Sequence, residues 1–181
     1  MRKIIITIFV VLSFICSCSE QNKPASNNPD KDKEKVQEKV VSNAGKYANP
    51  IKSIEELSMV IKQQPNNALI YNNRGTAYYS LGQHQLAIED YNKAISLKQN
   101  YADAYNNRGA AYYSLGQDKQ AIEDFNKAIS LKQNLANAYA NRGLIYLKQG
   151  KKELGCPDAK KACELGQCKV SKEAQSKRIC P

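Results

Sequence analysis

The chain has 181 residues, of which 42% are hydrophobic and 24% are charged, and its formal net charge is +10 at pH 7. This length allows one ordinary domain with a buried core. The sequence holds one histidine and has no P-loop, nucleophile elbow or metal-ligand cluster, so it argues against an enzyme, a bound cofactor or a metal site. The histidine, His84, is expected to be a solvated turn residue.

Residues 1–17 are typical of a cleaved signal peptide. Arg2 and Lys3 precede a mostly apolar run from Ile4 to Ile15. This run is shorter than the roughly 20 residues that a membrane-spanning helix needs. A buried N-terminal helix is the alternative, and it is disfavoured because the run has no polar face to turn towards water.

The segment "ICSC", which ends at Cys18, resembles the bacterial lipobox. The resemblance implies that Cys18 becomes the first residue of the mature protein and carries acyl chains such as palmitate. Since Ser19 follows the cysteine in place of aspartate, it also implies an outer-membrane lipoprotein that faces the periplasm or the cell surface. Ordinary secretion, with loss of Cys18, is the alternative.

Residues 18–49 would then form the lipidated N-terminus and a tether. The part from Gln21 to Ala48 is rich in Lys, Asp, Glu, Asn, Ser and Pro and poor in large apolar residues. Such a composition cannot bury enough apolar surface to offset the entropy lost on ordering. We therefore expect a disordered linker here.

A 34-residue repeat occupies most of the remaining chain. An aromatic residue, an arginine and a glycine each recur at this spacing: Tyr71, Tyr105 and Tyr139; Arg74, Arg108 and Arg142; Gly75, Gly109 and Gly143. Small residues and a second aromatic follow in the same register: Ala87 and Ala121; Tyr91 and Phe125; Ala94, Ala128 and Ala162.

This period and pattern resemble the tetratricopeptide repeat family. The resemblance implies an all-α solenoid of stacked helix-turn-helix units, each made of a helix A and a helix B. It predicts full units at 68–101, 102–135 and 136–169. Residues 50–67 would form a degenerate helix B that caps the front of the stack, and residues 170–181 would form a C-terminal capping helix.

Physical chemistry supports the same architecture without the resemblance. The two helices of a unit meet at "SLGQ", where Gly82 and Gly116 can adopt the left-handed conformation that ends a helix. Gly75 and Ala87 are small where helix A and helix B must approach closely. Each helix has an apolar stripe that one unit alone cannot bury, so neighbouring units must stack.

Charged residues recur in the same register. Arg74 and Asp90 are 16 residues apart, as are Arg108 with Asp124 and Arg142 with Asp158. We predict that each arginine on helix A pairs with the aspartate on helix B of the same unit. The alternative is that both charges are separately solvated.

Four cysteines lie near the C-terminus: Cys156, Cys163, Cys168 and Cys180. Their gaps of 7, 5 and 12 residues lack the short CxxC pairs that zinc sites favour. Export to an oxidising compartment favours disulfides. The segment "DAKKACELGQC" also resembles the cysteine-containing Sel1-like relatives of the repeat, whose disulfides brace helices.

The disulfide pairing follows from helix geometry. Cys156 and Cys163 lie seven residues apart on one helix, so their Cα atoms are about 10.5 Å apart, too far for a bond. If residues 172–178 form a helix antiparallel to helix B, Cys168 lies near the end of helix B and Cys180 near its start. We therefore predict the pairs Cys163–Cys168 and Cys156–Cys180.

The family resemblance implies that the helices A line a concave groove where partners bind. The candidate partner-binding residues at groove positions are Asn72, Asn73, Thr76, Tyr79, Asn106, Asn107, Tyr113 and Asn141. Amides can hold a peptide backbone without reading its side chains, and tyrosines add flat apolar contact. The alternative is that the asparagines hydrate the groove or bond to neighbouring helices.

Taken together, the sequence predicts a non-enzymatic, membrane-anchored adaptor that binds an extended peptide or protein partner in the cell envelope. Two alternatives remain open, a binder of cell-wall glycan or peptide and a Sel1-like enzyme acting on cell-wall precursors. Neither nucleic acid nor a small-molecule substrate is expected, because export separates the chain from nucleic acid and scattered lysines usually form a solvated face.

Overall fold

The computed structural model describes residues 49–180, so the predicted signal peptide, Cys18 and nearly all of the tether lie outside the described residues. In this range the chain forms eight α-helices and no strand. The helices are α2 (Pro50–Gln63), α3 (Ala68–Ser80), α4 (His84–Leu97), α5 (Ala102–Ser114), α6 (Asp118–Leu131), α7 (Ala136–Lys148), α8 (Lys152–Glu164) and α9 (Lys169–Ser176).

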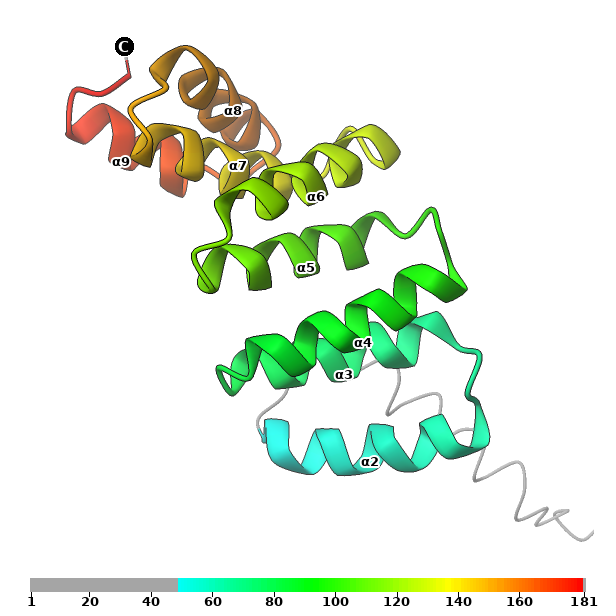
Figure 1. Cartoon of the computed structure of the whole chain (residues 1–181). Coiled ribbons are helices and arrows are strands. Elements are labelled where there is room, and N and C mark those ends of the chain that lie inside the picture. Colours follow the sequence, from blue (N-terminus) through cyan, green and yellow to red (C-terminus); the bar gives the residue numbers. More distant parts are fainter. Residues whose placement is uncertain (1–48, 181) are drawn as a thin grey trace, which may run out of the picture. The chain divides into compact units, whose positions relative to one another are not determined.

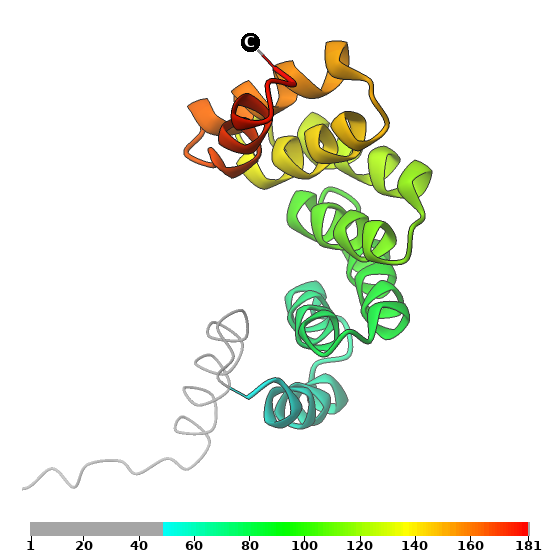
Figure 2. The same ribbon diagram turned by 90° about the vertical axis from the view of Figure 1, so that its left-hand side faces the viewer.

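The helices pack as a row of hairpins, which confirms the predicted α-solenoid (Figure 1). Three hairpins, α3–α4, α5–α6 and α7–α8, correspond to the three predicted units. Within the row, α3 contacts α5 and α5 contacts α7, so the helices A lie side by side. At the ends, α2 packs on α3, while α9 packs on both α7 and α8 (Figure 2).

The turns inside the hairpins end helix A as the sequence predicts. Gly82 and Gly116 both have φ of +73°, in the left-handed region where a side chain is disfavoured. The N–H of Gln83 donates to the carbonyl of Tyr78 over 2.9 Å, and Gln117 repeats this bond with Tyr112. These bonds satisfy carbonyl groups that the helix end would otherwise leave without partners.

Close approach of helix A and helix B explains the glycine in the middle of each helix A. A Cβ atom added to Gly75 would lie 2.7 Å from Tyr91 Cε1 and 3.2 Å from the carbonyl oxygen of Ala87. Tyr91 itself is only 1% exposed. The predicted contact between Gly75 and Ala87 is therefore confirmed, and a large aromatic ring fills the space beside it.

The three predicted arginine–aspartate pairs are all present, and all are bidentate. Arg108 donates from Nε and Nη2 to the two carboxylate oxygens of Asp124 over 2.8 and 2.7 Å. Arg74 with Asp90 and Arg142 with Asp158 repeat this geometry. Because the aspartates are buried, each pair needs this geometry to compensate for lost hydration. Hydrogen bonding to Asp124 raises the pKa of Arg108 above its usual value.

Each arginine also reaches the preceding unit, a contact that the sequence analysis missed. Arg108 donates from Nη1 to Asn92 Oδ1 over 2.6 Å, and Arg142 donates to Asn126 over the same distance. Arg74 donates to Ser58 Oγ over 3.1 Å. One side chain therefore joins helix A to two helices B. The recurrence of asparagine at the 34-residue spacing was the signal that could have revealed it.

The C-terminal end differs from the other units. The structure joins Cys156 to Cys180, with Cα atoms 5.6 Å apart, and Cys163 to Cys168, with Cα atoms 3.9 Å apart. These are the pairs that helix geometry predicts, and their formation in the exported protein stays a prediction.

The last helix is placed differently from the range 172–178 assumed from the sequence. It begins at Lys169 and ends at Ser176. Arg178 then takes φ of 54°, and the N–H of Ile179 donates to the carbonyl of Ala174 over 2.8 Å. This left-handed residue ends the helix and turns the chain back, so that Cys180 reaches Cys156.

Candidate functional site

The side of α3, α5 and α7 that carries the predicted groove positions is called the helix-A face here. Polar side chains link neighbouring helices along it. The hydroxyl groups of Tyr79 and Ser114 lie 3.2 Å apart, and Lys148 donates a hydrogen bond to the hydroxyl of Tyr113. Because Tyr79 and Tyr113 occupy equivalent positions, the same link is made twice, each time to the next unit. A row of partly exposed polar and aromatic groups therefore crosses all three units.

The asparagines at the groove positions mostly bond to the protein itself. Asn72, Asn73 and Asn106 are only 7%, 8% and 9% exposed. Asn107 donates from Nδ2 to Asn72 Oδ1 over 3.1 Å, and Asn106 donates to Asn107 Oδ1 over 3.3 Å. The structure thus shows, for Asn72, Asn106 and Asn107, the alternative in which the amides connect neighbouring helices.

The other candidate residues differ in whether their side-chain hydrogen-bonding groups are already used within the protein. Thr76 donates its hydroxyl to the carbonyl of Asn72 over 3.0 Å, while Tyr91 donates to Thr76 Oγ1 over 3.4 Å. Thr76 is therefore already bonded on both sides. Asn141 is half-buried, and its side-chain amide makes no hydrogen bond within residues 49–180. Tyr79, Tyr113 and Asn141 are thus the candidates best placed to contact a partner.

A small cavity of about 160 Å³ lies between α7 and α9, beside the last part of the helix-A face. Leu144 and Leu147 line it from α7, and Val170 and Ala174 line it from α9. Lys148, whose pKa is raised by its hydrogen bond to Tyr113, lies at the same cavity. The arrangement combines an apolar hollow with a cation, and the sequence analysis did not identify it because α9 has no counterpart in the repeats.

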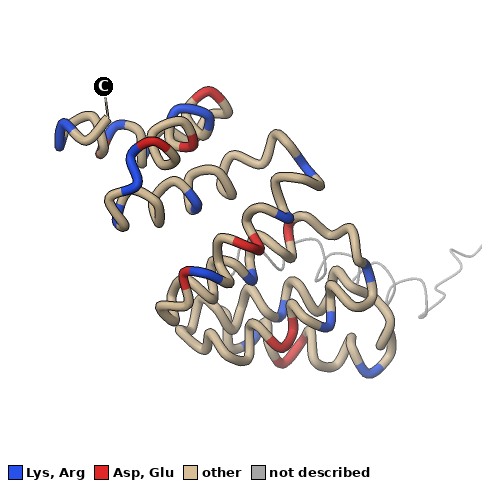
Figure 3. The backbone as a smooth tube through the Cα atoms, turned by 45° about the horizontal axis from the view of Figure 1, so that its top comes forward, with Lys and Arg blue, Asp and Glu red and all other residues tan. Residues whose placement is uncertain are grey.

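Positive charge gathers at the C-terminal end of the described chain (Figure 3). Residues 49–134 carry nine basic and eight acidic side chains, whereas residues 135–180 carry ten basic and four acidic ones. Such an excess attracts anionic partners over several ångströms at physiological salt. The end near α8 and α9 therefore favours anions.

The described residues hold no group of three or more His, Cys, Asp or Glu side chains arranged to bind a metal ion. Within 49–180, no helix combines the length and apolar character required to cross a bilayer. His84 is half-buried rather than fully solvated, and its ring centroid lies 5.1 Å from that of Tyr79. Its ring therefore packs against Tyr79, one of the tyrosines of the helix-A face.

Models of the TPR repeat match residues 75–116 and 111–150, and tetratricopeptide repeat models match residues 57–89 and 136–165. Among curated protein sequences, none matches the chain. Several solved structures are similar to it.

One solved structure, the crystal structure of MamA, is 30% identical in sequence, with a TM-score of 0.64 over 80% of this chain and 84% of MamA. The Arabidopsis OM64 TPR domain is 30% identical, with a TM-score of 0.59 over 62% of this chain and 93% of that domain. The first TPR of Spaghetti (RPAP3), bound to the HSP90 peptide SRMEEVD, is 26% identical, with a TM-score of 0.57 over 61% of this chain and 89% of that one.

Proposed function

Because the chain belongs to the tetratricopeptide repeat family, we propose that it is a non-enzymatic interaction scaffold that binds an extended protein segment on its helix-A face. The similar first TPR of Spaghetti (RPAP3) is bound to a peptide, which supports this kind of partner. Repeat proteins of this shape offer an elongated surface, which suits an extended segment better than a compact ligand.

The observation that carries this proposal is the row of side chains across the three units. Tyr79 and Tyr113 each present a flat ring and a hydroxyl, and each is held in place by a residue of the next unit. A side chain fixed in this way loses little entropy when a partner binds. Asn141 adds a free amide that can both donate to and accept from a peptide backbone.

The test is capture of envelope proteins by the full chain, compared with a variant that carries both Tyr79→Ala and Tyr113→Ala. We expect the recovered partner to fall at least about tenfold, because buried aromatic anchors commonly contribute 1.4 kcal/mol or more to binding. Lys93→Ala with Lys127→Ala is the matched control, since both lysines are exposed on the helices B. Equal recovery with the tyrosine variant and wild type, when both are folded, would remove the helix-A face from the mechanism.

We further propose that the scaffold is held at an envelope membrane through acyl chains on Cys18, with the residues up to 49 as a tether. The resemblance of "ICSC" to the lipobox supports this, and each buried methylene of an acyl chain contributes about 0.8 kcal/mol to membrane binding. Cys18→Ala should leave the membrane fraction or remain unprocessed. Normal processing with normal membrane retention would contradict it.

A further inference from the structure

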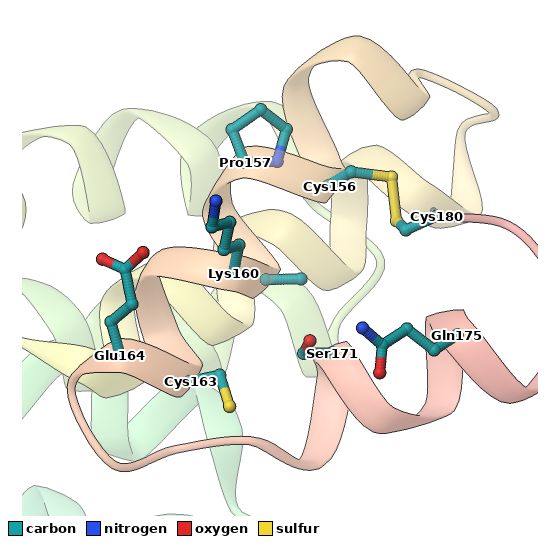
Figure 4. A pocket seen from close by; sticks show the side chains of 9 residues that line it. Cys156, Pro157, Lys160, Cys163, Glu164, Ser171, Gln175 and Cys180 are labelled. Carbon is teal, nitrogen blue, oxygen red and sulfur yellow. A yellow bond between two sulfur atoms is a disulfide. The ribbon is translucent and has the colours of Figure 1, made fainter.

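A cavity lies away from the helix-A face, between α8 and α9. Its volume is about 710 Å³, within the range of small-molecule pockets in proteins. Figure 4 shows its walls, with Cys156, Pro157 and Cys163 on α8, Ser171 and Gln175 on α9, and the disulfide from Cys156 to Cys180 at one end. The lining is mostly apolar.

This cavity is present because the third unit carries small residues where the other two carry large ones. Tyr91 and Phe125 are 1% and 0% exposed, and they fill the interface between helix B and the following helix A. The equivalent residue on α8 is Ala159. Cys156 and Cys163 likewise stand where the first two units have isoleucine. Smaller side chains therefore line the hollow between α8 and α9, and Ala159 itself is buried at its wall.

Two disulfides lie at the ends of α9 beside this space. Cys156 is bonded to Cys180 beyond α9, and Cys163 is bonded to Cys168 in front of α9. Both links tie the chain on either side of α9 back to α8. These covalent links fix where the two ends of α9 lie relative to α8.

Three of the side chains that line the cavity carry polar groups without a hydrogen-bond or ion-pair partner within residues 49–180. The side chains of Ser171 and Gln175 make no hydrogen bond within residues 49–180, although both line the cavity. Glu164 also lines the cavity and pairs with Lys161 over 3.4 Å, whereas the ammonium group of Lys160 makes no ion pair within residues 49–180. An apolar body, a few hydrogen-bonding groups and one free cation together describe the complement of an amphiphile with an anionic head.

We propose that the α8–α9 cavity binds a monomeric amphiphile, whose unbranched apolar chain lies between the helices and whose carboxylate meets Lys160. Ser171 and Gln175 supply hydrogen bonds to the head group. The positive excess of residues 135–180 adds a general attraction for the anion. Binding here is independent of the peptide-binding role of the helix-A face, because the two surfaces share no lining residue.

The test uses the full chain and the fluorescent fatty acid 11-(dansylamino)undecanoic acid as the probe. Wild type should bind one equivalent with a blue-shifted emission. Ala159→Phe, which restores the ring found at Phe125, should weaken binding at least about tenfold. Ser171→Phe fills the cavity from α9 instead, and it keeps the test meaningful should Ala159→Phe fail to fold, as judged by circular dichroism.

Head-group recognition is tested separately. Lys160→Gln should weaken the fatty acid about tenfold, whereas Lys152→Gln, exposed on the same helix but outside the cavity, should not. Dodecylamine, a cation with a similar chain, should fail to displace the probe. Co-sedimentation with vesicles of anionic phospholipid, measured without the probe, distinguishes a free fatty acid from a lipid in a bilayer, and we expect it to be equal for wild type and Ala159→Phe. Equal probe binding by wild type and a folded cavity-filling variant, displacement by dodecylamine equal to that by laurate, or loss of vesicle binding in a folded Ala159→Phe variant would each overturn the proposal.

Discussion

The first two units and the third unit keep the same polar links but fill their interfaces in different ways. Arg108 and Arg142 each bind a buried aspartate with two hydrogen bonds and reach an asparagine of the preceding unit. In contrast, the fully buried ring of Phe125 has only Ala159 as its counterpart on α8. In the third unit, disulfides lie at the positions that isoleucines occupy elsewhere.

This difference shows that each repeat unit has two structural requirements, the register of its helices and the stability of their interface. The arginine fixes the register of a helix A between two helices B, and it does so in every unit. The buried apolar side chains stabilise the interface but do not set the register, so smaller residues and disulfides can replace them. An end unit has no following repeat to cover it, and covalent links there can replace buried apolar area.

The largest effect should follow from removing the ring in the second unit. Phe125→Ala should lower the free energy of unfolding by about 4 kcal/mol, because a buried aromatic side chain is lost and a cavity is left. Urea unfolding followed by circular dichroism measures this. Glu123→Ala, exposed on the same helix, is the control. A loss below about 1 kcal/mol would show that the ring is not what holds this interface.

Breaking the disulfide from Cys156 to Cys180 should have the next largest effect, confined to the C-terminal end. The bond closes a loop with a sequence separation of 24, so its loss should cost about 3.5 kcal/mol in chain entropy. Hydrogen exchange of Cys156→Ser with Cys180→Ser should show faster exchange in α9 and unchanged rates in α3 to α6. Peptide mapping of the native protein without reductant checks the linkage, and a bond between Cys156 and Cys163 would contradict the pairing.

Loss of an arginine should have a smaller effect, and the same one in both regions. Arg108→Met and Arg142→Met should each cost about 2 kcal/mol, because each leaves a buried aspartate without its partner. Urea unfolding of the two variants tests this. Asp124→Asn in combination with Arg108→Met should cost less than the sum of the single changes. A cost at Arg108 with none at Arg142 would mean that the third unit does not rely on this link.

The repeat made much of the fold predictable from the sequence. The 34-residue spacing of Arg74, Arg108 and Arg142 fixes which helices are equivalent, so a pattern seen once can be checked twice. The arginine–aspartate pairing followed from that spacing because the partner aspartate shares the same register, whereas its bidentate geometry did not. A left-handed turn at Gly82 and Gly116 likewise followed from local chemistry.

The candidate site was less predictable. Position in the repeat indicates which face a residue lies on, but not whether its hydrogen bonds are already made by a neighbour. The bond from Asn107 to Asn72 depends on the spacing between two helices, which the sequence pattern does not report. The α8–α9 cavity was not predicted for another reason. It depends on the small side chain at Ala159, where the other units have an aromatic ring, and on the position of α9, which has no counterpart in the repeats.

The most direct test of the central claim, that the helix-A face binds a partner, is site-specific photocrosslinking in living cells. A photoreactive amino acid at Ser80, which is exposed at the end of α3 and equivalent to Ser114, lies on that face, and one at Lys127 is exposed on α6 away from it. We expect a discrete crosslinked protein band from position 80 and none from position 127, with the band lost when Tyr79→Ala and Tyr113→Ala are added. Crosslinks of equal strength from position 127, or a band from 80 that survives both tyrosine changes, would contradict the claim.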